Sequence, residues 1–403
     1  MSADAYPDLR EPAPRSLCTD CGVSRMKDPG LCGRACQFIA PDYPAFEEAV
    51  HGHRRGQEDE VFFGPFEAMY RARMAEPENG AQWTGITTSL GADLLARGKV
   101  DAVLTMVPDA EDRWRPQPVL ITEVSQMARA RGMRMGYAPL LALLEEAREK
   151  GFKRLAVIGI PCQVYALRAL EKELGLERLY VIGTPCSDNT STENFHQFLA
   201  LLDEDPDSIS YLEFRADYKV ELRFDDGRVR LIPFLSLPIS DLPQDFFPLT
   251  CRTCVDYTNA LADITVGYMG GEGDQWVLVR NARGAEILEG LGERIVLSEP
   301  GTAGKRAGAV KGFIANTARA AGGLPLRRMP DWVRPVVSFL QPRIGPRGLE
   351  FARARVEMKA AETVLHLRRA IPAKMKNMVP AHVWKIAEPY DLKPQEGETK
   401  PRD

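Results

Sequence analysis

Through the middle of the chain, segments with the apolar pattern of a helix alternate with segments that have the apolar pattern of a strand. Between residues 82 and 202, short apolar runs alternate with stretches in which apolar residues recur every three or four positions. This alternation predicts a parallel sheet covered by helices on both faces. The predicted elements are strands at 100–107, 153–160 and 179–183 and helices ending near 97, at 138–149, at 163–174 and at 192–202. An earlier helix is predicted around residues 65–74.

After residue 205 the period changes to two. Apolar and polar residues alternate over 210–215, 219–224 and 229–233, and Asp225-Asp226-Gly227 supplies a hairpin turn. Two more strands are predicted at 262–268 and 276–280. These segments predict antiparallel additions to the parallel core.

The C-terminal region has a different character. Apolar residues at helical spacing predict a long helix from residue 349 to Pro372, with Val356, Val364 and Leu367 on one face. Residues 301–380 carry sixteen Lys or Arg and four Asp or Glu, a net charge of +12, whereas the whole chain carries −4. Such a helix either docks on the body of the protein or lies on a membrane surface. No apolar run approaches the roughly 20 residues of a membrane span.

Eight cysteines are the strongest chemical signal. The first residues lack the basic end and apolar core of a signal peptide, so we expect a cytoplasmic protein in which disulfides are rare. Cysteines in that compartment favour metal or redox use. Four lie close together near the N-terminus, two form a C-x2-C pair, and two stand alone; they are Cys18, Cys21, Cys32 and Cys36, then Cys251 and Cys254, then Cys162 and Cys186. Four thiolates make a closed zinc site or one iron–sulfur cluster, and spacing alone leaves both open.

The two single cysteines share one setting. Cys162 follows one predicted strand in GIPC, and Cys186 follows the next in GTPC, each just before a helix. The carboxyl ends of adjacent parallel strands meet at the ligand-binding edge of an open sheet. Helix N-termini also favour the thiolate form. We therefore expect both to be cluster ligands rather than buried core cysteines.

Two long segments carry a family resemblance. They are GIPCQVYALRALEKELGLERLYVIGTPCSDNTSTENFHQFLALL and CRTCVDYTNALADITVGYMGGEGDQWVLVRN. They resemble the family formed by the beta subunits of deazaflavin-reducing hydrogenases, and within it two chlorophyll-biosynthesis branches: ferredoxin-dependent divinyl chlorophyllide 8-vinyl reductases and 7-hydroxymethyl chlorophyll a reductases. The compact GEGDQWVLVRN stretch is more similar to the vinyl reductases. Many relatives begin with a tighter CSxCGLC run, where this chain has Ser24, so Cys32 is expected to replace that ligand.

The resemblance implies one FAD, two 4Fe–4S clusters and reduced ferredoxin as the electron source. It implies that Cys18, Cys21, Cys32 and Cys36 bind one cluster. Cys162, Cys186, Cys251 and Cys254 would bind the other. The expected activity is reduction of the 8-vinyl group of divinyl (proto)chlorophyllide, with 7-hydroxymethyl chlorophyll a reduction or the role of a beta subunit in a deazaflavin-dependent hydrogenase or dehydrogenase as the alternative.

The flavin contacts are predicted from residue chemistry. A Thr/Gly-rich segment before a helix offers backbone N–H groups to a phosphate, although plain helix capping would use the same residues. The candidates are Thr84, Gly85, Thr87, Thr88 and Ser89, with Asn189 and Thr190 as second choices. Candidate proton donors are Asp188, Glu193, His196, Asp256 and Tyr257.

The sequence thus predicts an α/β protein with a mixed sheet. Its expected parts are an N-terminal iron–sulfur module (1–45), a flavin-binding part (46–150), a part with the second cluster (151–300) and a basic, largely helical C-terminal region (301–403). Dispersed basic residues without an interleaved aromatic stripe argue against nucleic acid as a partner. We expect a homo-oligomer that meets its pigment in the cytoplasm or peripherally at the photosynthetic membrane.

Overall fold

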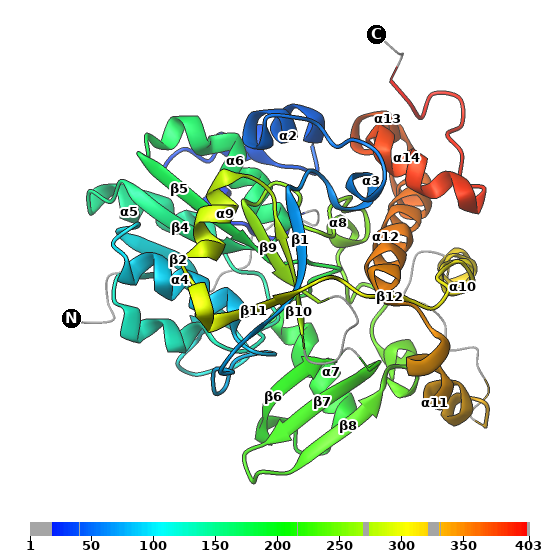
Figure 1. The fold of residues 1–403 in the computed structure, drawn as a ribbon. Coiled ribbons are helices and arrows are strands. Elements are labelled where there is room, and N and C mark those ends of the chain that lie inside the picture. Colours follow the sequence, from blue (N-terminus) through cyan, green and yellow to red (C-terminus); the bar gives the residue numbers. More distant parts are fainter. Residues whose placement is uncertain are drawn as a thin grey trace.

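The computed structural model describes residues 18–39, 41–215, 217–268, 274–320, 330 and 332–400. An eight-stranded mixed sheet forms its centre (Figure 1). The strand order is β11 (Ile295–Ser298), β1 (Ala68–Met74), β10 (Gln275–Val279), β9 (Ile264–Gly267), β5 (Arg178–Gly183), β4 (Arg154–Gly159), β2 (Ala102–Pro108) and β3 (Pro116–Ile121). Strands β9, β5, β4 and β2 are parallel neighbours, and the flanking pairs are antiparallel. The predicted parallel core is confirmed.

Helices cover both faces because the central strands are apolar on both sides. In β4, Leu155 and Val157 pack into one buried cluster, whereas Ala156 and Ile158 pack into the other. The first cluster includes α5 (Leu143–Glu149) and α6 (Pro161–Leu174), joined by α1 (Leu31–Ala35) and α2 (Tyr43–His51). The second cluster includes α4 (Ile86–Ala96) and α9 (Ala282–Glu289). This is the pattern of a buried parallel sheet.

A separate three-stranded antiparallel sheet lies beside the main one (Figure 1). Its strands are β6 (Ile209–Phe214), β7 (Lys219–Phe224) and β8 (Val229–Pro233). Phenylalanines of α7 (Thr192–Leu202) pack against its inner face. The antiparallel strands predicted after residue 205 are thus confirmed, and they form a separate sheet.

The C-terminal region is mainly helical and packs on the body. Its elements are α10 (Ala307–Arg319), α11 (Arg334–Ile344), α12 (Leu349–Ala370), α13 (Met375–Met378) and α14 (Ala381–Ala387), with the short strands β12 (Thr302–Ala303) and β13 (Arg347–Gly348). Val356, Val364 and Leu367 of α12 lie in a buried cluster with Trp276 of β10 and with α3 (Asp59–Phe63). The alternative that this apolar face rests on a membrane is therefore wrong, because the protein's own core covers it. Among the described residues, no helix is long and apolar enough to cross a bilayer.

The predicted helix around residues 65–74 is also wrong. Residues 68–74 form β1, which pairs with both β10 and β11. Ala, Met and Arg favour helices in isolation, but two ladders of backbone hydrogen bonds outweigh that weak preference.

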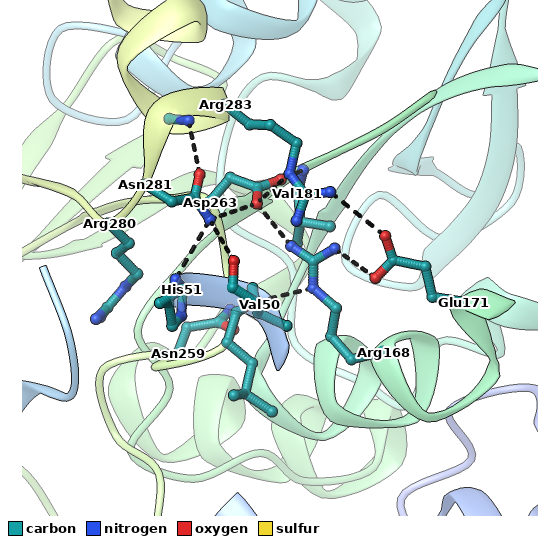
Figure 2. Close-up of polar contacts among 12 residues, drawn as sticks. Val50, His51, Arg168, Glu171, Val181, Asn259, Asp263, Arg280, Asn281 and Arg283 are labelled. Carbon is teal, nitrogen blue, oxygen red and sulfur yellow. Dashed lines mark hydrogen bonds and ion pairs between the residues drawn. The ribbon is translucent and has the colours of Figure 1, made fainter. Parts of the chain in front are cut away.

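A buried charge network ties the strand ends together (Figure 2). Asp263, just before β9, accepts hydrogen bonds from Arg168 of α6 at 2.8 Å, from Arg283 and Asn281 at 2.9 Å, and from the Val181 backbone N–H at 2.7 Å. Both Asp263 and Arg168 have side chains that are fully buried. Burial raises the pKa of Asp263, but the two arginines outweigh it and the net pKa is lowered. The network fixes the start of β9 against β5 and α6.

Candidate redox site

Four cysteines that are distant in sequence meet at the carboxyl ends of β4 and β5. Cys162 lies in the first turn of α6, directly after β4, and Cys186 follows β5. Cys251 lies in α8 (Leu249–Arg252), and Cys254 follows that helix. All four line one small cavity of about 20 Å³, and we call them the inner cysteines. The predicted placement of Cys162 and Cys186 at neighbouring strand ends is confirmed by the parallel β4–β5 register.

The loop between α8 and β9 is held against this edge of the sheet. The Asn259 side-chain amide donates to the Gly159 carbonyl at 2.8 Å and to the Thr184 carbonyl at 3.2 Å. The Cys186 N–H donates to the Tyr257 carbonyl at 3.0 Å. Together with the Asp263 network, these bonds set the position of the C-x2-C pair relative to the two strand ends.

The N-terminal cysteines form a second group beside the first. Besides burial, which is the largest cause, the thiolate forms of Cys36, Cys18 and Cys32 would each raise the pKa of Cys21, so these three residues lie near Cys21. The Cys21 carbonyl accepts the Leu141 N–H at 2.9 Å. Gly22 makes this approach possible, because its φ is +104° and a Cβ there would lie 2.5 Å from the Ala142 nitrogen. We call these four residues the outer cysteines.

Two side chains of the N-terminal segment connect the two groups. The Thr19 hydroxyl donates to the Cys162 sulfur at 3.6 Å, and the Gln37 amide donates to the Cys254 sulfur at 3.7 Å. Cys21 also acts electrostatically on Cys162. The outer group therefore abuts the inner group and supplies hydrogen-bond donors to its sulfurs.

Burial is the main cause of the raised pKa values among these thiols. It raises the pKa of Cys21 and Cys251 to about 12 and that of Cys254 to about 11. All eight cysteines are free of disulfides. Among the described residues, no three His, Cys, Asp or Glu side chains converge on a point where they would hold one metal ion.

A cavity of about 810 Å³ adjoins the inner cysteines and shares Cys186 with their small cavity. It runs from the sheet edge to the three-stranded sheet and to α10 and α12, and aromatic residues such as Phe195, Phe214 and Phe351 line it. Of the predicted flavin contacts, Gly85, Thr87, Thr88 and Asn189 line this cavity. Three others have structural bonds instead and do not line it.

The hydroxyls of those three residues make hydrogen bonds within the protein. The Thr84 hydroxyl lies 3.1 Å from the Met74 N–H and 3.2 Å from the Gln275 amide oxygen. The Ser89 hydroxyl donates to the Gly85 carbonyl at 2.9 Å, and the buried Thr190 hydroxyl donates to the Phe246 carbonyl.

The cavity wall includes an arginine loop that sequence reasoning missed. Arg131 and Arg134 line the cavity on a loop that also includes Gly132 and Gly136. Burial lowers the pKa of Arg134 to about 10, and its guanidinium donates to the Arg131 and Gly132 carbonyls at 2.7 and 3.0 Å. The buried Nε atoms of both arginines have no hydrogen-bond partner among the described residues. The sequence feature that could have indicated this loop is its three arginines, at 129, 131 and 134.

Helix α12 contributes a polar cluster to the opposite wall. The Lys359 ammonium lies 2.7 Å from an Asp188 oxygen and 3.0 Å from a Glu362 oxygen, and all three residues line the cavity with His366. Of the five candidate proton donors, Asp188 and Tyr257 line the cavity.

The other three candidates lie elsewhere. Glu193 pairs with Arg115, and His196 lies 2.9 Å from Asp112. Asp256 accepts the Ala260 N–H.

Two family models match the chain. Both describe the beta subunit of coenzyme F420 hydrogenase/dehydrogenase: the model of its N-terminal part matches residues 69–145, and the model of its C-terminal part matches residues 152–302. Together they cover more than half of the chain.

Curated relatives extend over almost its full length. An uncharacterized protein of Nostoc sp. is 35% identical, covering 96% of each chain. The chloroplastic 7-hydroxymethyl chlorophyll a reductase of Oryza sativa subsp. japonica is 37% identical, covering 93% of this chain and 82% of the relative. One component of the F420H2 dehydrogenase of Methanosarcina mazei is 30% identical over 55% of this chain and 62% of its own.

A solved structure shares the fold. A chain of the F420-reducing [NiFe] hydrogenase complex from Methanosarcina barkeri superposes with a TM-score of 0.53 at 23% identity, covering 60% of this chain and 85% of that one.

Proposed function

Because the chain belongs to the family of coenzyme F420 hydrogenase/dehydrogenase beta subunits, we propose that it is an iron–sulfur flavoprotein that reduces a chlorophyllide-type tetrapyrrole. The donor is reduced ferredoxin, and electrons pass through two 4Fe–4S clusters to FAD. The reaction is conversion of the 8-vinyl group of divinyl (proto)chlorophyllide to ethyl. The observation that carries this proposal is the large, largely apolar cavity that adjoins the inner cysteines.

The chemistry of the cysteines fits two clusters. Buried thiols with raised pKa values remain protonated unless a bound cation stabilises the thiolate. A single zinc ion requires all four sulfurs within about 2.3 Å of one point, whereas a cluster distributes its four thiolates over separate irons. Membership of a family of redox enzymes favours the cluster. Thr19 and Gln37 would then stabilise negative charge on two inner sulfurs.

The arginine loop fits the diphosphate of a flavin dinucleotide. Arg134 is a partly buried cation whose buried Nε lacks a partner among the described residues, and Gly85 at the start of α4 lines the same cavity. Guanidinium groups and helix N-termini are the usual donors to phosphate oxygens. Bound clusters would supply single electrons, and a bound flavin would supply the hydride chemistry.

The remaining cavity wall suits a flat, apolar macrocycle. Phe351 stacks edge-on with Tyr218 and Tyr268 at 5.8 and 4.8 Å between ring centroids, so the wall is rigid and aromatic. Arg355 provides a cation at the same wall for a substrate carboxylate. These residues hold the macrocycle and exclude water while Asp188 and Tyr257 lie within the same space as proton sources.

A second candidate is reduction of 7-hydroxymethyl chlorophyll a. The observation that favours it is the 37% identity to the rice reductase over most of both chains. Both candidates use the same cofactors and the same class of substrate.

One assay tests both. The reconstituted protein is incubated anaerobically with reduced ferredoxin and either divinyl chlorophyllide or 7-hydroxymethyl chlorophyll a. We expect a blue shift of the absorption of divinyl chlorophyllide as the vinyl group becomes ethyl. Turnover of the hydroxymethyl substrate alone would replace the first candidate by the second, and turnover of neither would refute the proposal.

A further inference from the structure

Helix α11 exposes an apolar stripe that no other described element covers. Trp332, just before the helix, and Val336, Leu340 and Ile344 follow one another at four-residue steps, and Phe339 lies beside them. Trp332 is 80% exposed and Phe339 is 63% exposed. Five of the twelve large apolar side chains that are exposed in the described residues lie in this segment of thirteen residues. Residues at this spacing share one face of a helix.

The stripe lies in a strongly cationic part of the chain. Residues 301–349 contain nine Lys or Arg and a single Asp or Glu. The Arg343 guanidinium lies 4.0 Å from the centroid of the Phe339 ring, so a cation is part of the stripe itself. Lys305, Lys311 and Arg343 are exposed and form no ion pair with any described residue. The stripe therefore combines an apolar face with a cation, Arg343, in a segment of net positive charge.

The stripe also borders the large cavity. Gln341 of α11 and Pro346 just after it line that cavity, as do Ala309, Phe313 and Thr317 of α10. Helix α11 lies at the periphery of the molecule next to the three-stranded sheet (Figure 1). The stripe is therefore carried by a helix that also contributes a residue, Gln341, to the cavity wall.

We propose that α11 and its flanking residue Trp332 form a docking surface for an anionic lipid bilayer, with the stripe inserted at the headgroup level and the adjacent cations facing anionic headgroups. An apolar helical face with Trp and basic flanks is the composition of an interfacial helix. Positive charges near an anionic leaflet add attraction that decreases with salt.

A second copy of this chain fits the α11 surface less well than an anionic bilayer does. A two-fold interface through α11 would bring together two copies of a segment of net positive charge, with Arg343 on the stripe of each, and like charges in contact cost free energy. An anionic bilayer supplies the complementary charge. The inference rests on the exposed surface and not on the proposed reaction, so lipid binding and turnover can fail independently.

The test is flotation of the full-length reconstituted protein with vesicles. Phosphatidylcholine vesicles with about 30% phosphatidylglycerol are compared with pure phosphatidylcholine. We expect binding to the anionic vesicles, and a loss of about tenfold or more in the triple variant Val336→Ser/Phe339→Ser/Ile344→Ser. The matched control is Val229→Ser/Leu231→Ser, which removes two exposed apolar side chains from β8 and should bind as the unmodified protein does.

Trp332 gives a second readout that needs no disruptive substitution. It is the one exposed tryptophan among five, since the other four are buried or partly buried. Its emission should shift to the blue on addition of anionic vesicles, and the shift should be absent in Trp332→Phe. Absence of flotation and of the shift would overturn the proposal. A triple variant that binds anionic vesicles as the unmodified protein does would also overturn the proposal. If light scattering shows that the triple substitution converts a dimer into a monomer, the surface belongs to a second copy, and the proposal is overturned as well.

Discussion

Replacing Asp263 by Asn tests whether the buried charge network holds the cysteine edge of the sheet together. The substitution keeps the shape of the side chain but removes its negative charge. Arg168 would then remain fully buried, with Glu171 and the Leu261 carbonyl as its acceptors at 2.8 and 3.0 Å. Removing one member of a buried pair costs about 3–5 kcal/mol. Because Arg168 retains these two acceptors, we expect the free energy of unfolding to fall by about 3 kcal/mol, the lower limit of this range.

The assay is urea unfolding followed by circular dichroism, across a range of pH. The two arginines hold the pKa of Asp263 below its usual value despite burial, so its contribution is present above the unfolded pKa of about 3.9. It is lost as the pH falls through the lower folded pKa. The difference in stability between the native protein and Asp263→Asn should therefore be constant from about pH 5 to 8 and shrink below about pH 4.

The control is Asp225→Asn, which breaks an exposed pair with Arg113 on the hairpin turn. It should leave the urea midpoint unchanged, since exposed pairs contribute little. An Asp263→Asn midpoint equal to that of the control would refute the reasoning. A stability difference that grows as the pH falls would refute it as well.

The site and the fold lead to four further predictions. Arg134→Met should weaken flavin binding about tenfold or more in equilibrium dialysis and retain full iron, whereas the exposed Arg129→Met should change neither. Cys18→Ser should remove about half of the iron and keep the flavin, and Cys254→Ser should abolish flavin reduction; full iron in either variant would disprove the ligand assignment. With an acidic protein donor, the turnover rate should fall as ionic strength rises through about 0.15 M, and a salt-independent rate would contradict electrostatic docking. Deleting residues 349–403 should give insoluble protein, because α12 fills the core next to β10, and a soluble, folded truncation would contradict this.

The sequence predicted the parts of the fold in which local pattern and tertiary environment agree. Strands β4 and β5 are apolar on both faces because both faces are buried. Their continuous apolar runs could therefore be predicted as strands from the sequence. The Gly/Pro-Cys motifs after them identified the ligand-binding edge. Strand β1 was misread because its Ala, Met and Arg residues favour a helix, and only its pairing with β10 and β11 decides otherwise.

The site was predictable only where it lies next to a motif. The cysteines and Gly85 belong to recognisable segments. Arg134 and Lys359 come from a loop and a distant helix, and no local pattern shows that they face one cavity. The role of α12 could not be predicted because an amphipathic helix has the same sequence whether it docks on a sheet or on a bilayer.

Iron and flavin content tests the central claim most directly. The protein is reconstituted anaerobically, its iron and flavin are quantified per chain, and its visible absorbance is followed on reduction with dithionite. We predict a brown protein with about eight irons and one flavin per chain whose broad absorbance bleaches on reduction. A colourless protein that holds zinc at the same cysteines would contradict the account.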